Sequence, residues 1–155
     1  MYVTDVTNRT TIGQKIREIY TGVETYFYQF SYDGVLGGND AHYDGADFVG
    51  HSEDMFYLFC YSVGCDFSIY PESDQVTSER LVSIWTNFAK YQNPTPEPSE
   101  LLQNITWPIV STEGGDFLYV DINENLEIKN HPKEKTYGKW VELYDSLGYS
   151  DFDTY

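Results

Sequence analysis

The chain has 155 residues and carries 9 Lys and Arg against 25 Asp and Glu, a formal net charge of −16. This acidity argues against nucleic acid and anionic membrane surfaces as partners, because both would repel it. The length suits one domain or part of one, and the 41% of hydrophobic residues argues against a disordered chain.

Membrane and export signals are not visible. The longest apolar run, Met55 to Tyr61, is too short to span a bilayer, so we expect no transmembrane segment. The first residues lack the basic and apolar regions of a signal peptide, so none is expected in this chain. Cys60 and Cys65 are compatible with one local disulfide or with two reduced thiols.

The first two predicted elements are a helix and a buried strand. Thr11 to Ile19 places isoleucines at helical spacing and predicts a short amphipathic helix. Thr25 to Tyr32 carries aromatic residues on both faces, which is typical of a strand inside a sheet that is covered on both sides. Such a strand needs neighbouring strands, and nothing before it in the chain supplies one.

A long loop and a polar segment follow the predicted strand. Residues Asp33 to Gly50 are rich in Gly, Asp and Asn and predict a loop. His51 to Phe59 is polar and then aromatic, so we expect a loop that carries a site and runs into a short helix or turn.

The second half of the chain predicts a helix, a hairpin and a final helix. Apolar residues recur at helical spacing in Thr77 to Tyr91, where Thr77 or Ser78 would cap the start and Asn93-Pro94 the end. The remaining elements are a hairpin of Phe117 to Ile122 and Leu126 to Lys129, and a helix of Lys135 to Leu147 with Gly148 after its end. We expect Trp85, Phe88 and Trp140 to be core residues rather than the wall of a substrate pocket. The order of elements favours an α/β protein.

His51 is the main candidate for chemistry. A histidine in a loop just beyond a buried strand is where α/β-hydrolases keep their general base. The alternative is a surface histidine that happens to lie beside carboxylates. A weaker candidate for the general base is His42, which lacks the Tyr-Leu-Phe run that follows His51. Asp40, His42 and Asp44 also resemble a metal cluster, but they lack the ligand spacing of a calcium loop and indicate a solvated acidic loop. His131 is expected at the surface.

Several segments together resemble type-B carboxylesterases, in particular insect-type carboxylesterases and juvenile hormone esterases of the cholinesterase-like superfamily. The segment from Gly45 to Phe59 resembles the family's catalytic-histidine segment, in which Gly-His is followed by acidic residues and a Tyr-Leu-Phe-like run. Residues Tyr26 to Gly34 resemble its last long buried strand. Further matches follow in the same order: Leu81 to Lys90 with Asn93-Pro94, Trp107-Pro108, Tyr119 to Ile122, and Trp140. The sequence departs from the family's pattern at Met55-Phe56, where Leu-Pro is commoner.

The resemblance implies a fold and a reaction. The fold is the C-terminal portion of an α/β-hydrolase, and residues 1–155 would be the C-terminal part of a catalytic domain. The reaction is hydrolysis of a small carboxylic ester through an acyl-serine, with His51 as general acid and base and with neither a metal nor an organic cofactor. The resemblance also favours a secreted protein, and Asn8 and Asn104 lie in glycosylation sequons.

The rest of the catalytic triad has no counterpart in the 155 residues. The family's order along the chain is serine, acid, histidine, and no Gly-x-Ser-x-Gly motif occurs here. Because the family takes its acid from an upstream segment, we interpret Glu53 and Asp54 as carboxylates that support the histidine or the following helix. The alternative is a non-catalytic cholinesterase-like binding or adhesion module, or an inactive truncated product. An intact His51 favours the enzyme, and the missing serine favours the alternative.

Overall fold

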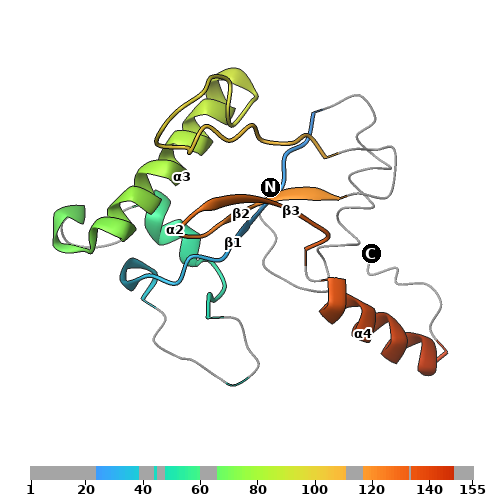
Figure 1. Ribbon diagram of the computed structural model, residues 1–155. Helices are drawn as coiled ribbons and strands as arrows, with labels where there is room; N and C mark the ends of the chain where they lie inside the picture. Colours follow the sequence, from blue (N-terminus) through green and yellow to red (C-terminus); the bar gives the residue numbers. More distant parts are fainter. Residues whose placement is uncertain are drawn as a thin grey trace. The chain divides into compact units, whose positions relative to one another are not determined.

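A computed structural model describes residues 24–38, 44, 48–59, 66–110, 117–132 and 134–148. These residues fall into two compact units, one of 28–108 with 120–128 and the other of 1–27, 109–119 and 129–155. The helix predicted at Thr11 to Ile19 lies outside the described residues, as do Cys60 and Cys65. The elements in chain order are β1 (Tyr28–Phe30), η1 (Val35–Gly37), α2 (Glu53–Leu58), η2 (Phe67–Ile69), α3 (Glu72–Tyr91), β2 (Leu118–Ile122), β3 (Leu126–Asn130) and α4 (Glu134–Ser146), shown in Figure 1.

The sheet has three strands in the order β1-β2-β3 within the described residues. β1 pairs in parallel with β2, with Tyr28 opposite Val120 and Phe30 opposite Ile122. The Ser31 amide extends the pairing by donating a hydrogen bond to the Ile122 carbonyl at 2.8 Å. A parallel pair needs a crossover connection, which here contains α2 and α3. The neighbour that the aromatic strand requires therefore comes from about 90 residues further along the chain, and the strand itself is shorter than predicted.

Helix α3 begins five residues before its predicted start. Its N-cap is Pro71, whereas Thr77 and Ser78, which we expected as caps, are buried inside the helix. The buried face begins with Asp74, a carboxylate, and continues through Leu81. A search for apolar periodicity misses this first turn because its buried residue is polar. The end of the helix at Tyr91 and the predicted final helix, observed as α4, agree with the sequence to within a residue or two.

Three aromatic residues that we expected in the core are exposed. The exposed fractions are 36% for Trp85, 46% for Phe88 and 41% for Trp140. The expectation is wrong for α3 because its buried stripe runs from Asp74 through Thr77 and Ser78 to Leu81 and Ile84, and Trp85 lies at its margin. In α4, the Trp140 ring lies 6.3 Å from that of Tyr144, on the next turn of its own helix.

The region after α3 is held together by side-chain to backbone hydrogen bonds within the first unit. Asn87 donates to the carbonyl of Pro94 at 3.1 Å, and the Trp107 amide donates to the hydroxyl of Thr95 at 2.9 Å. Pro94 and Trp107 are both buried. These contacts return the chain from the end of α3 towards the sheet.

The second unit has its own small core. Phe27, Val110, Phe117 and Tyr119 are buried together, and the rings of Phe27 and Phe117 meet edge to face at 5.1 Å. The predicted hairpin is confirmed, with β2 and β3 joined by residues 123–125, which belong to the first unit. Gly148 follows α4 with a positive φ of 80°, the conformation expected of a glycine after a helix end.

Candidate functional site

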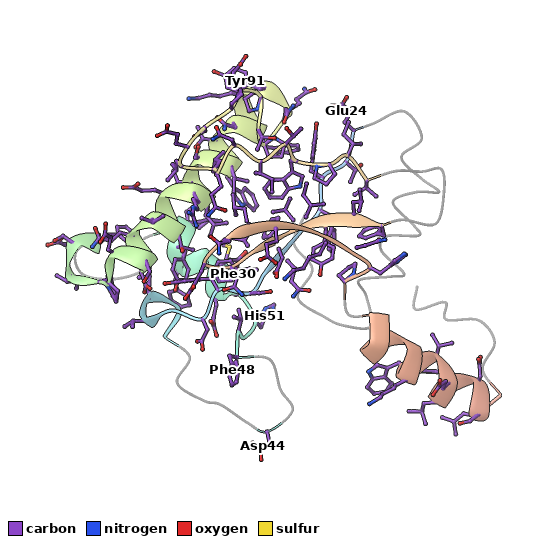
Figure 2. All side chains as sticks on the ribbon, viewed as in Figure 1. Glu24, Phe30, Asp44, Phe48, His51 and Tyr91 are labelled. Carbon is purple, nitrogen blue, oxygen red and sulfur yellow. The ribbon has the colours of Figure 1, made fainter. Side chains whose placement is uncertain are left out.

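His51 lies on a turn directly before α2, and its side chain is exposed. Two hydrogen bonds bracket it. The Gly50 amide donates to Glu53 Oε1 at 2.6 Å, and the Met55 amide donates to the carbonyl of Ser52 at 3.1 Å. Ser52 adopts a left-handed conformation with φ of 67°. Figure 2 shows His51 on this segment, between Phe48 and α2. The turn is thus held by one hydrogen bond from the Gly50 backbone to the Glu53 side chain and by one backbone hydrogen bond that follows His51.

Glu53 is a buried carboxylate beneath this turn. It is only 4% exposed. Besides accepting from Gly50, it packs against η1, because a Cβ added to Gly37 would lie 2.8 Å from Glu53 Oε2. The carboxylate therefore fills the space between the histidine turn and η1, and a side chain at position 37 would displace its Oε2.

Asp54 connects α2 to the sheet. It is fully buried, and its Oδ2 accepts a hydrogen bond from the Tyr28 hydroxyl of β1 at 3.0 Å. Its Oδ1 has no hydrogen-bond partner among the described residues. Burial disfavours the charged form and raises the pKa of Asp54 to about 7. This group consequently keeps its proton to a much higher pH than an ordinary aspartate does.

Tyr28, the partner of Asp54, is itself held by aromatic contacts. Its ring meets Trp85 of α3 and Trp107 edge to face, at centroid distances of 6.5 Å and 6.3 Å. Burial raises the pKa of Tyr28 to about 12, so its hydroxyl remains a donor at physiological pH. The Tyr28 hydroxyl that donates to Asp54 is therefore held in place and stays protonated at physiological pH.

Helix α2 is also anchored at its far end. Tyr57 is fully buried, and its ring contacts Phe30 at 5.2 Å and Tyr32 at 5.7 Å. Its backbone carbonyl accepts a hydrogen bond from the Ser78 hydroxyl of α3 at 2.7 Å. The short helix after the histidine is thus bound both to the strand and to the long helix.

One further buried residue lies beside this site and was not predicted from the sequence: Asp74 of α3, which is 1% exposed. It accepts hydrogen bonds from Tyr32 and from the amide of Leu36, each at 2.7 Å. The signal that could have revealed it is its spacing, since Asp74 precedes Leu81 by seven residues on the same helical face.

The other residues singled out in the sequence are not brought to this turn by any described contact. Asp44 is exposed, and His42 and Asp40 lie outside the described residues, as does Asn8. His131 is partly buried and has a positive φ of 50°. Asn104 is exposed, with φ of 52°.

The described residues contain neither a metal-binding cluster nor a membrane-spanning helix. No three His, Cys, Asp or Glu side chains among them come together where they could hold a metal ion. None of the helices in the described ranges is long and apolar enough to cross a membrane.

The arrangement as a whole is suited to proton transfer. An exposed imidazole on a defined turn can accept and return a proton, provided that a partner group is presented to it. Of the two carboxylates that follow in the sequence, Glu53 accepts a hydrogen bond from Gly50 and Asp54 accepts one from Tyr28.

The chain matches a known protein family. The family model described as the carboxylesterase family matches residues 1–140. A juvenile hormone esterase of Tribolium castaneum is 32% identical over 108 residues, which is 69% of this chain and 17% of the esterase. A bile salt-activated lipase of Rattus norvegicus is 30% identical over 80% of this chain and 19% of the lipase, and glutactin of Drosophila melanogaster is 31% identical over 83% of this chain and 12% of glutactin.

A solved structure shows the same relationship. The juvenile hormone esterase of Manduca sexta, determined with OTFP covalently attached, matches with a TM-score of 0.61 and 25% identity, over 92% of this chain and 26% of the esterase. The expected α/β-hydrolase fold class is thereby confirmed as a partial fold. The chain spans less than a fifth of the length of these curated relatives. The family model covers residues 1–140 of the 155, and this chain belongs to the carboxylesterase family.

Proposed function

We propose that this chain supplies the general acid–base histidine, His51, of a carboxylic ester hydrolase that works through an acyl-serine intermediate. The observation that carries the proposal is the exposed His51 on a turn that is bracketed by the Gly50–Glu53 and Ser52–Met55 hydrogen bonds. Since the chain spans less than a fifth of its relatives, the serine and the acid would come from sequence outside these 155 residues.

In this reaction the imidazole moves one proton in each direction. It accepts the proton of the serine hydroxyl as the serine oxygen attacks the ester carbonyl, and it returns that proton to the departing alcohol. Water then takes the place of the alcohol, and the same two transfers release the acid and restore the serine. A turn with a defined backbone favours this role, because general-base catalysis depends on the placement of the base.

Glu53 and Asp54 are proposed as positioning residues and not as the triad acid. The acid of a triad must stay ionised to stabilise the imidazolium. Asp54, with a pKa of about 7, is only partly ionised at neutral pH. Glu53 already accepts a hydrogen bond from the backbone of the turn. The structure therefore supports a role in which the two carboxylates hold the turn against η1 and β1.

The substrate class, location and modification follow from the same family membership. We propose a small carboxylic ester as substrate, by analogy with relatives named as an esterase and as lipases. We further propose a secreted glycoprotein, with sugar at Asn8 and Asn104; the exposed side chain of Asn104 supports the second site.

The test compares histidine variants in the esterase that contains this segment. His51→Ala should lower kcat for an aryl ester by about 10⁴-fold or more while the circular dichroism spectrum stays unchanged, because the triad acts as a unit. His131→Ala is the matched control and should retain activity. Loss of activity in His42→Ala but not in His51→Ala would overturn the assignment.

A second experiment on the same protein tests the alternative, which is a non-catalytic binding or adhesion module or an inactive product. The absence of a Gly-x-Ser-x-Gly motif from these 155 residues is the observation that favours it. A fluorophosphonate probe labels the activated serine of a hydrolase. If no serine of the protein takes up the probe, the alternative is correct.

A further inference from the structure

A third buried carboxylate, Asp74 of α3, holds the loop that follows β1. Its Oδ1 accepts a hydrogen bond from the Tyr32 hydroxyl, and its Oδ2 accepts one from the Leu36 amide in η1. Both carboxylate oxygens are therefore used, one by a side chain just beyond the strand and one by the backbone four residues later. Hydrogen bonds to a charged acceptor are stronger than those between neutral groups.

The loop held by Asp74 is packed without spare volume. A Cβ added to Gly34 would lie closer than 3.0 Å to Tyr57 Oη, to Tyr32 Cε1 and to Asp74 Oδ1. Three side chains from three segments therefore meet at this glycine. Because the Tyr57 hydroxyl comes from α2, the loop cannot move without disturbing the helix that follows His51.

A continuous set of contacts leads from this loop to the histidine turn. The last residue of η1, Gly37, lies against the carboxylate of Glu53. The same carboxylate accepts the hydrogen bond from Gly50. The contacts therefore run from Asp74 to η1, from η1 to Glu53, and from Glu53 to Gly50. Each is a hydrogen bond or a close approach.

From this set of contacts, we infer that Asp74 is a positioning residue for His51 and acts through η1 and Glu53. Its effect on catalysis rests on the proposed role of His51, whereas its effect on the Gly50 backbone does not. Asp74 and His51 are 23 residues apart in the sequence, so no local motif indicates this relation.

Amide hydrogen exchange on the purified protein tests the inference directly. Asp74→Ala should speed exchange at both Leu36 and Gly50 by at least about tenfold, because each backbone group loses its support. Glu72→Ala, an exposed acid on the same helix, is the matched control and should change neither. Faster exchange at Leu36 with unchanged exchange at Gly50 would overturn the inference, because Asp74 would then act only locally.

Kinetics of the esterase that contains this segment provide the second measurement. Asp74→Ala should lower kcat by about 10- to 100-fold with KM nearly unchanged, as expected for a misplaced base. Asp74→Asn should recover most of kcat, since its amide can accept from Leu36 and donate to Tyr32. An equal loss in kcat for the alanine and asparagine variants would contradict the role.

Two further comparisons distinguish a failure of the structural inference from a failure of the proposed function. If Asp74→Ala does not fold, Tyr32→Phe removes a single hydrogen bond and should speed exchange at Gly50 by a smaller factor; unchanged exchange there would overturn the inference. If His51→Ala leaves activity intact while Asp74→Ala still speeds exchange at Gly50, the proposed function fails and the structural inference stands.

Discussion

Replacing Asp54 with asparagine should change how the stability of the protein depends on pH. Burial raises the pKa of Asp54 from 3.8 to about 7 in the folded protein. Between these values the unfolded chain has lost the proton and the folded protein still holds it. The contribution of this group to the free energy of unfolding is therefore fully present below pH 3.8 and is lost as the pH rises to 7.

The size of the effect follows from the shift. Each pKa unit corresponds to about 1.4 kcal/mol, so three units correspond to roughly 4 kcal/mol over this range. This is an upper limit, because the hydrogen bond from Tyr28 to Oδ2 favours the ionised form. Asparagine keeps an acceptor for Tyr28 and does not ionise, so the variant lacks this pH dependence.

The assay measures urea unfolding of the wild type and of Asp54→Asn at intervals of one pH unit from pH 4 to pH 8. The stability of the wild type minus that of Asp54→Asn should fall with rising pH and level off above pH 7. Asp66→Asn is the control: hydrogen bonds from Ser68 lower the pKa of exposed Asp66 below 3.8, so its contribution is lost only below about pH 4 and the difference for this variant should stay nearly constant from pH 4 to pH 8. If the difference for Asp54→Asn is the same at pH 4 and pH 8, the reasoning is refuted.

Four further predictions concern packing, activity and modification. Gly34→Ala should destabilise the protein by about 2–4 kcal/mol in chemical denaturation, through steric crowding and loss of a buried hydrogen bond. Gly38→Ala is the control: its new Cβ meets nothing within 4 Å, but its φ of +71° is strained for alanine, so the variant should lose only about 1 kcal/mol of stability. Equal losses of stability in the two variants would contradict the steric explanation. Gly138→Ala, in α4 with open space around it, should raise stability by about 0.5–1 kcal/mol, whereas a loss would show an unseen contact there. The 155-residue chain by itself should hydrolyse an aryl ester no faster than background, because it holds no Gly-x-Ser-x-Gly motif; turnover abolished by His51→Ala would show otherwise. After secretion from insect cells, mass spectrometry should find sugar at Asn104 that is absent from Asn104→Gln, and an unmodified asparagine would rule out that site.

Local spacing determined the elements that consist of short-range contacts. The hairpin of β2 and β3, the end of α3 and most of α4 follow from alternation, from apolar periodicity and from proline and glycine. These patterns succeed because each element's hydrogen bonds join residues close together in the sequence. The same holds for His51, since the polar and then aromatic run after it predicted the short helix that the structure shows as α2.

Burial was predicted less well, because it depends on the neighbours of an element. Trp85 and Phe88 have the spacing of core residues, but α3 turns a more polar stripe towards the protein. Apolar periodicity could not show that stripe, because Asp74 belongs to it and a buried carboxylate is stable only when partners are supplied. Its partners, Tyr32 and Leu36, lie 42 and 38 residues away.

The sequence patterns thus indicate the family, the order of elements and His51 with its two acidic neighbours. The roles of three buried carboxylates depend on the fold instead: Glu53 accepts from the turn, Asp54 accepts from Tyr28 of β1, and Asp74, which no pattern indicated, holds the intervening loop. The tertiary structure also decided that β1 pairs with β2. The physical reason is the same in each case. Burying a carboxylate or a strand edge requires a hydrogen-bond partner, and folding supplies that partner from a part of the chain that local patterns do not reach.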